Sequence, residues 1–222
     1  MNTQVEFVAE FTTNHMGNLN LLLKMVDAAA DAGASLIKMQ KKDVENFYSQ
    51  EKLNSSYLSP YGLTYRDYRT TFEFDYDDHV KFDRRCKDRG IDWFATAQDR
   101  ASLDFLLKFD LPMYKVASCN AKDTAFLDYI RSRIGDKPMV VSTGGTNLDD
   151  IDAVVELIDD RQLYVLQCTS TYPCPLGELH LGNIPALADR YKSNPNVSVG
   201  YSGHELGIEP SVVAAQLDIR RS

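Results

Sequence analysis

Two lysines that interrupt apolar runs are the residues best suited to chemistry. Lys38 follows the run Ser35–Ile37, and Lys115 stands between Met113-Tyr114 and Val116-Ala117. An ammonium group on a buried strand can bind a phosphate or carboxylate, or form a Schiff base with a carbonyl substrate. A single lysine of this kind is equally well explained by snorkelling or an ion pair. Two of them in a chain of net charge −8 indicate an anionic small-molecule ligand.

Polar groups also gather where the apolar runs end. They are Glu10 with Thr12, Thr13, Asn14 and His15; Gln40; Thr96 with Gln98; Ser118; Ser142-Thr143-Gly144-Gly145; Gln167-Cys168-Thr169-Ser170; and Ser202-Gly203-His204. Hydroxyls and backbone N–H groups suit an anion, and a neutral imidazole is a good metal ligand. Structural interpretations stay open, with Glu10 as a buried partner of the lysines, His15 as a loop cap and His204 as a rim histidine.

The elements that position these groups are short strands alternating with amphipathic helices. The predicted strands are Val5–Phe11, Ser35–Gln40, Ile91–Ala97, Met113–Ser118, Pro138–Thr143, Leu163–Thr169 and Val197–Ser202. The predicted helices are Leu19–Ala32, His79–Arg89, Arg100–Lys108, Thr124–Arg133, Asn147–Asp159, with Asn147 as its N-cap, and Asn183–Tyr191. Seven such units predict a parallel α/β fold.

An open doubly wound sheet and a (β/α)8 barrel both fit this pattern. No GxGxxG follows the first strand, which disfavours a dinucleotide-binding sheet. A barrel gathers the carboxyl ends of its strands at one rim, and polar groups follow all seven strands. We therefore expect a TIM-type barrel of seven readable units, with the segment Lys41–Asp77 forming a loop or hairpin over its mouth.

The bulk properties exclude several classes of protein. Hydrophobic residues make up 44% and charged residues 25% of the 222 positions, and no apolar run of about 18 residues predicts a transmembrane helix. Net negative charge disfavours nucleic acid and anionic membranes as partners. The start Met1–Glu6 has no leader pattern, so we expect a cytoplasmic protein.

Individual cysteines and histidines carry weaker signals. The four cysteines show no CxxC spacing, which favours reduced thiols over disulfides or a zinc site. Cys119 and Cys168 are interpreted as small packing residues. His79 and His180 are interpreted as surface residues of helices.

Five segments, in order, resemble the sialic acid (nonulosonic acid) synthase family. They are Ala9–Gly17, Ala32–Gln40, Tyr114–Ser118, Gln167–Pro173 and Gly200–Glu205. The resemblance implies a TIM barrel that condenses phosphoenolpyruvate with an N-acetylmannosamine-like amino sugar and releases phosphate with C–O cleavage. It also implies a divalent metal, Mn2+ or Mg2+, that polarises the aldehyde.

The same resemblance implies a role for each matching residue. Glu10, Lys38 and Lys115 would be catalytic. Gln40, Thr96, Ser118, Asn120, Ser142, Ser170, Tyr172 and Ser202 would bind substrates, with the lysines and serines on phosphoenolpyruvate and with Tyr172 and Gln40 at the sugar. His204 would be one of two histidine ligands of the metal.

Two departures from the family pattern stand out. The family carries a glutamate two residues after the strand-four serine, and this chain has Asn120. The family also continues into an eighth strand with the second metal histidine and then into a small dimerising antifreeze-like domain, whereas this sequence stops at Ser222. We expect residues 1–222 to be one incomplete barrel domain that binds metal weakly and turns over poorly.

Two alternatives to the synthase remain. A Schiff-base aldolase would use Lys38 or Lys115, and borohydride with pyruvate would trap it but not a synthase. A truncated barrel could also bind a sugar or a partner chain without turnover, as Asn120 and the missing histidine favour. The amino sugar itself is not identified, and the segment Lys41–Asp77 is expected to select it.

Overall fold

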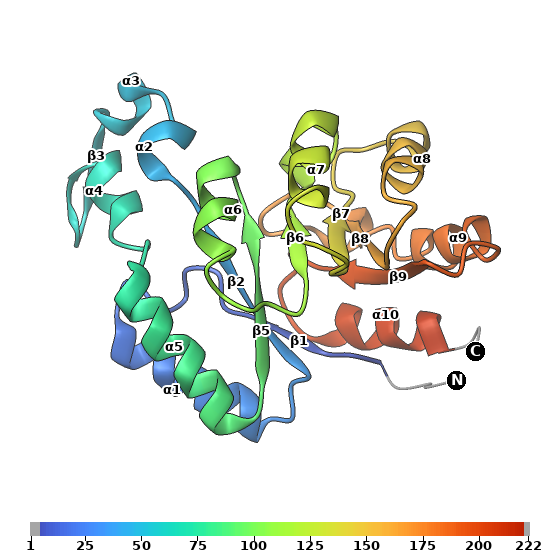
Figure 1. The fold of residues 1–222 in the computed structure, drawn as a ribbon, viewed down its shortest axis with the longest axis horizontal. Coiled ribbons are helices and arrows are strands. Elements are labelled where there is room, and N and C mark those ends of the chain that lie inside the picture. The colour runs from blue at the N-terminus through green and yellow to red at the C-terminus, as the bar shows by residue number, and fades with distance from the viewer. Residues whose placement is uncertain (1–4, 220–222) are drawn as a thin grey trace. The chain divides into compact units, whose positions relative to one another are not determined.

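The computed structural model describes residues 5–219, so residues 1–4 and 220–222 lie outside the description. Residues 220–222 end the C-terminal segment after which the eighth strand is expected to be missing, and they lie outside the described residues. Strands and helices alternate along the chain (Figure 1). The described residues form two compact units, an N-terminal unit of residues 6–112 and a C-terminal unit of residue 5 with residues 113–219, and each unit is described by itself.

The N-terminal unit is built on three parallel strands. They are β1 (Val8–Glu10), β2 (Leu36–Lys41) and β5 (Asp92–Ala97), with β2 paired to both of the others. In this register Glu10 lies beside Lys38, and Gln40 lies beside Thr96. Neighbouring residues of parallel strands point to the same face, as do residues two apart along one strand. All four side chains therefore belong to one face of this sheet.

Three helices complete the framework of this unit. They are α1 (Leu19–Asp31), α5 (Tyr76–Arg89) and α6 (Arg100–Leu106). Asp27 of α1 accepts hydrogen bonds from Arg85 Nε at 2.7 Å and Nη2 at 2.6 Å, which ties α1 to α5. Gly90 ends α5 in the left-handed conformation, with φ of +65°, a common helix stop.

His79 is a core residue of α5, which makes the surface interpretation wrong. The residue is only 3% exposed, and its ring centroid lies 4.9 Å from that of Phe105 and 5.8 Å from that of Phe109. Burial lowers the pKa of His79 to about 4, so the imidazole is neutral. His180 is exposed, as predicted, but precedes its helix instead of lying on it.

The segment Lys41–Asp77 contains the predicted hairpin and three short helices. Strands β3 (Ser56–Ser59) and β4 (Gly62–Thr64) pair antiparallel. The helices are α2 (Val44–Phe47), α3 (Gln50–Leu53) and α4 (Tyr65–Thr70). Aromatic rings hold them together, with Tyr57 and Tyr68 centroids 4.6 Å apart and Tyr48 and Tyr65 centroids 5.2 Å apart.

The C-terminal unit has four parallel strands. They are β6 (Tyr114–Val116), β7 (Met139–Ser142), β8 (Leu163–Cys168) and β9 (Val197–Ser202), paired in that order. Their helices are α7 (Thr124–Arg131), α8 (Leu148–Leu157), α9 (Asn183–Arg190) and α10 (Glu209–Ile219), with 3-10 turns η1 (Ser118–Asn120) and η2 (Leu176–Glu178). Asn147 caps α8 as predicted, in a reciprocal box with Asp150.

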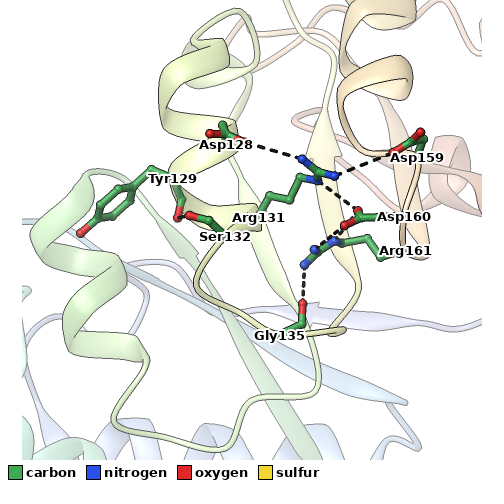
Figure 2. Close-up of polar contacts among 8 residues, drawn as sticks. All are labelled: Asp128, Tyr129, Arg131, Ser132, Gly135, Asp159, Asp160 and Arg161. Atoms are coloured by element: carbon green, nitrogen blue, oxygen red, sulfur yellow. Dashed lines mark hydrogen bonds and ion pairs between the residues drawn. The ribbon is translucent and has the colours of Figure 1, made fainter.

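Charged groups pair with one another near the amino ends of β7 and β8 (Figure 2). Asp160 accepts from Arg131 Nε at 3.1 Å and from Arg161 Nε and Nη2, each at 3.0 Å. The buried Arg161 also donates to the Gly135 carbonyl at 2.6 Å. This network joins the connection after α7 to the connection after α8.

All seven predicted strands and six predicted helices are present, with boundaries shifted by three residues or fewer. Helix α10 was not predicted, because its apolar residues do not follow one stripe; Val212 and Val213 are exposed at 57% and 48%, while Ala214 is buried. None of the helices within residues 5–219 is long and apolar enough to cross a bilayer.

Candidate functional site

In the C-terminal unit, the predicted ligand groups lie at the carboxyl ends of the strands. Lys115 pairs in register with Val140, two residues before Ser142, so both polar side chains belong to one face. Lys115 Nζ donates to Ser142 Oγ at 2.7 Å, and both residues are buried. Cys168 at the end of β8 and Ser202 at the end of β9 are in register with each other and lie on this same face.

Two more predicted serines converge on Gly144. The Gly144 N–H donates to Ser118 Oγ at 3.0 Å. A β-carbon at Gly144 would lie 2.2 Å from Ser170 Oγ and 2.9 Å from Ser118 Oγ. The glycine therefore lets both hydroxyls approach the backbone at one point. The role of Gly144 was missed, because Ser142–Gly145 also fits a plain helix entry.

His204 is held by the loop after β8. Its Nδ1 lies 2.8 Å from the Thr169 carbonyl oxygen, and because a carbonyl only accepts, Nδ1 carries the hydrogen. The same nitrogen is 3.8 Å from Cys168 Sγ. The Tyr172 ring stacks on the imidazole, with centroids 3.9 Å apart, and remains 73% exposed. The predicted metal and sugar residues, His204 and Tyr172, therefore form one contact pair.

Cys168 takes part in this group as more than a packing residue. It is buried as expected, but its Sγ accepts from Ser118 Oγ at 3.6 Å. Burial on its own raises the pKa of the thiol, yet the contacts with His204 and Ser118 prevail and lower that pKa below its usual value. Burial likewise opposes protonation of His204, while Cys168 and the Thr169 carbonyl raise the imidazole pKa.

The residues just after β6 lie in the turn η1. Ser118 and Asn120 are half-buried, and the Asn120 N–H donates to the Ala117 carbonyl at 2.9 Å. Cys119 between them is exposed, so its interpretation as a packing residue is wrong. A one-turn 3-10 segment places successive side chains on different sides, which is why Cys119 points outward.

In the N-terminal unit, Glu10 and Lys38 form an ion pair across β1 and β2. The predicted partnership is confirmed, but the predicted burial of Glu10 is wrong, since its side chain is 47% exposed whereas that of Lys38 is 11% exposed. The Thr12 N–H donates to Glu10 Oε1 at 3.0 Å. Oε1 of Glu10 thus accepts from the loop, and Oε2 pairs with the ammonium group of Lys38.

Gln40 and Thr96 occupy the next row of the same sheet face. Thr96 is 2% exposed, and its Oγ1 has no hydrogen-bond partner within the part of the chain that the structure describes. A buried hydroxyl without a partner is unfavourable, so Thr96 Oγ1 has hydrogen-bonding capacity that the described residues leave unused. His15 is a buried loop cap whose Nδ1 accepts from the Gly17 N–H at 3.1 Å.

The predicted residues therefore form two groups, one in each unit. Glu10, Lys38, Gln40 and Thr96 share one sheet face of the N-terminal unit. The contacts above connect Lys115 with Ser142, Ser118 with Cys168, and Cys168 with His204, while Ser118 and Ser170 both lie beside Gly144. Ser202, half-buried, joins the second group by its register with Cys168.

A cavity of about 470 Å³ in the C-terminal unit was not predicted. Thr143, Gln167 and Asn183 line it. Thr143 and Gln167 alternate with Ser142 and Cys168 along their strands, so they face the helices instead. Gln167 donates to the Leu179 carbonyl at 3.2 Å and accepts from Asn183 Nδ2 at 3.3 Å. Cys168 and Ser170 also line this cavity, so it extends to the group of residues at the carboxyl ends of the strands.

The expected divalent metal does not find a complete ligand set here. Within residues 5–219 no group of three or more His, Cys, Asp or Glu side chains is arranged to hold a metal ion. His204 offers one imidazole, whose Nδ1 is engaged by Thr169. The described residues alone thus do not fit the metal, and no chemical step is assigned to it.

Two synthases from other organisms resemble this chain along nearly its whole length. It is 32% identical to the N-acetylneuraminate-9-phosphate synthase of Drosophila melanogaster over 97% of this chain and 58% of that one. It is 31% identical to the pseudaminic acid synthase of Campylobacter jejuni, over 98% of this chain and 63% of that one. The chain thus spans less than two thirds of the length of these relatives.

A solved structure resembles the fold. The N-acetylneuraminic acid (sialic acid) synthetase of Leptospira borgpetersenii, crystallised in complex with citrate, matches with a TM-score of 0.81 and 27% identity, over 95% of this chain and 68% of that one. The predicted α/β fold of TIM-barrel type, with seven readable strand–helix units, is confirmed. The model of the NeuB family matches residues 25–218, and the chain therefore belongs to the NeuB family.

Proposed function

We propose that this chain carries the catalytic region of a synthase that joins phosphoenolpyruvate to an amino sugar of the N-acetylmannosamine type. C3 of phosphoenolpyruvate forms a bond to the aldehyde carbon, and the aldehyde oxygen gains a proton. Water adds at C2, and the C–O bond to phosphate breaks. The products are a nonulosonic acid and inorganic phosphate. Family membership supports the reaction class.

The hydrogen bond from buried Lys115 to Ser142, beside the hydroxyls grouped at Gly144, is the observation that carries the proposal. Phosphoenolpyruvate is a small, highly charged anion that needs one or more cations and several donors. An ammonium group and hydroxyls in a buried setting meet that need, because charge-assisted hydrogen bonds are the strong ones. The serines can turn their O–H groups from each other to the ligand.

The N-terminal unit supplies the second part of the proposal. Lys38 would add a second positive charge for phosphoenolpyruvate, while Glu10, half-exposed and within reach of solvent, would hydrogen-bond the sugar or move a proton. Thr96 Oγ1 would gain the partner that it lacks among the described residues, and Gln40 would line the sugar. Asn120 cannot act as a base, so the proton taken from water needs a carboxylate such as Glu10.

A divalent cation remains part of the proposal through His204 alone. With Nδ1 donating to Thr169, the lone pair of the neutral ring is on Nε2. His204 could therefore contribute one ligand, and the remaining ligands would have to come from beyond the described group.

Phosphate release from phosphoenolpyruvate, measured across a panel of amino sugars, tests the function. We expect slow release, as for a chain that binds metal weakly, and only with an aldehyde sugar present. Borohydride with pyruvate should leave the chain unlabelled, since labelling would indicate a Schiff-base aldolase. No phosphate release with any sugar in the panel, with Mn2+ present, would contradict the proposal for this chain.

A further inference from the structure

The loop between β1 and α1 contains two residues other than glycine in the left-handed region of the backbone. Thr12 has a φ of +40° and Met16 has a φ of +53°. A β-branched residue at positive φ is an outlier, because its β-carbon crowds the following carbonyl oxygen. Such strain persists only where the surrounding contacts require it. Each of the two conformations therefore needs a contact that accounts for it.

The left-handed turn at Thr12 directs both of its donors to one carboxylate oxygen. The Thr12 N–H donates to Glu10 Oε1 at 3.0 Å, and the Thr12 hydroxyl donates to the same oxygen. The other oxygen, Glu10 Oε2, pairs with Lys38. Because both oxygens are held by different partners, the carboxylate can neither swing away nor rotate freely.

A glutamate as exposed as Glu10 would otherwise change rotamer easily. Its side chain is half-exposed, whereas the ammonium group that it meets belongs to the buried Lys38. An ion pair that is open to solvent on one side restrains its partners weakly, and Lys38 holds only one of the two oxygens. Ordering a long side chain costs conformational entropy. The two donors of Thr12 offset that cost and fix the second oxygen.

The shape of the loop does not depend on the Thr12 side chain. The turn at Met16 brings the Gly17 N–H to Nδ1 of the buried His15, at 3.1 Å. A β-carbon at Gly17 would lie 2.4 Å from the Thr71 carbonyl oxygen, so this end of the loop is packed closely against the end of α4. A glycine at position 12 would adopt the same φ without strain and would keep the N–H donor. The hydroxyl is therefore the donor that threonine adds.

We propose that Thr12 is a positioning residue that holds the Glu10 carboxylate in the orientation in which it meets the amino sugar. This inference rests on the proposed function, which gives Glu10 a hydrogen bond to the sugar or a proton to move. A group that acts at one atom gains from being fixed before the ligand arrives, because a displacement of about 1 Å can cost roughly 100-fold in rate. Thr12 acts through Glu10 and is assigned no contact with the substrate.

NMR of the full chain tests the hold on Glu10 without any substrate. Selective labelling of glutamate reports the order of the Glu10 side chain, whose signals are identified by their loss in Glu10→Gln. We expect an ordered side chain in the wild type and in Thr12→Ser, which keeps the hydroxyl, and a mobile one in Thr12→Gly. A mobile Glu10 in the wild type, or an equally ordered one in Thr12→Gly, would overturn the inference.

Phosphate release from phosphoenolpyruvate shows whether this hold serves the reaction, and Met16→Gly is the matched control. Both glycine variants relieve backbone strain in the same loop, so neither should lower the urea midpoint, but only Thr12→Gly removes a donor to Glu10. Thr12→Gly should lower kcat by about tenfold and raise KM for the sugar, with KM for phosphoenolpyruvate unchanged. Thr12→Ser and Met16→Gly should keep all three values.

Two kinetic outcomes would overturn the inference. An unchanged kcat in Thr12→Gly would mean that the reaction does not need the hydroxyl. Equal losses in Thr12→Gly and Met16→Gly would assign Thr12 to the shape of the loop. A wild type that has an ordered Glu10 and releases no phosphate would contradict the proposed function and would still support the hold of Thr12 on Glu10, so the two failures are distinguishable.

Discussion

The two ends of the strands in the C-terminal unit hold their polar groups in opposite ways. At the amino ends, Arg131, Asp160 and Arg161 neutralise one another (Figure 2). At the carboxyl ends, Lys115 donates to the neutral hydroxyl of Ser142, and the hydroxyls of Ser118 and Ser170 approach Gly144. The first arrangement satisfies charges within the fold, and the second offers charge and donors to a ligand. The proposed function thus places binding at the end of the strands opposite to the ion-pair network.

The largest effect should come from Lys115→Met. We expect phosphate release from phosphoenolpyruvate to fall by about 100- to 1,000-fold, in the range found when one preorganised donor is removed from a reacting anion. The urea midpoint should hardly fall, because methionine fills the same buried space. Kinetics and a urea titration on one preparation measure both.

Lys192→Met is the matched control, since Lys192 is an exposed lysine of the same unit paired with Asp189. It should change neither quantity. An Lys115 variant that lost stability and kept its activity would assign Lys115 to the core instead of the ligand.

The next effect should come from Gly144→Ala. The added β-carbon would stand 2.2 Å from Ser170 Oγ and 2.9 Å from Ser118 Oγ, so both hydroxyls must turn away. We expect kcat/KM for phosphoenolpyruvate to fall by about 10- to 100-fold, with most of the change in KM. Steady-state kinetics at saturating sugar measure it, and an unchanged KM would mean that these serines do not contact the ligand.

The sequence predicted the framework well because burial and periodicity determine it. Each of the seven strands is an apolar run with polar groups after it, and the caps at Asn147 and Gly90 follow local chemistry. The Glu10–Lys38 pair follows from register alone once the two strands are neighbours. These are short-range or repeating signals that a single sequence carries.

Other features depend on tertiary contacts that leave no periodic trace. His79 has a polar side chain but is packed among Phe105, Phe109 and Trp93. The helices between residues 44 and 70 are four to six residues long, too short for a 3.6-residue pattern to repeat.

The third effect concerns the ion-pair network near the amino ends of β7 and β8. Asp160→Asn removes the charge that holds the buried Arg161, and we expect a loss of about 2 kcal/mol of unfolding free energy, discounted from larger values for fully buried pairs because Asp160 is 40% exposed. Activity per folded molecule should stay the same. Asp159→Asn is the control, since Asp159 is 73% exposed and 3.9 Å from Arg131, and it should change little.

The pH dependence of stability should report on the same network of Arg131, Asp160 and Arg161. Arg161 first, and then Arg131, hold the pKa of Asp160 well below its usual value of 3.8. A carboxylate with a depressed folded-state pKa contributes stability above the unfolded-state pKa, and that contribution is lost as the pH falls below about 4. Wild-type stability should therefore fall more steeply than that of Asp160→Asn as the pH is lowered through this region. Urea titrations of both proteins at a series of pH values measure this dependence. Equal slopes of stability against pH in the two proteins would contradict the assignment.

The smallest effect should come from Gly135→Ala, the counterpart of Gly144→Ala at the amino ends. Gly135 has a φ of +62° and no neighbour within 4 Å of a built β-carbon, so the added methyl group meets backbone strain and no side chain. That strain is about 1 kcal/mol, partly offset by the smaller entropy of the unfolded chain. We expect a small loss in the urea midpoint and unchanged kinetics. The two substitutions are chemically identical, so a kinetic defect in Gly135→Ala, or a purely thermodynamic one in Gly144→Ala, would break the separation between the two ends.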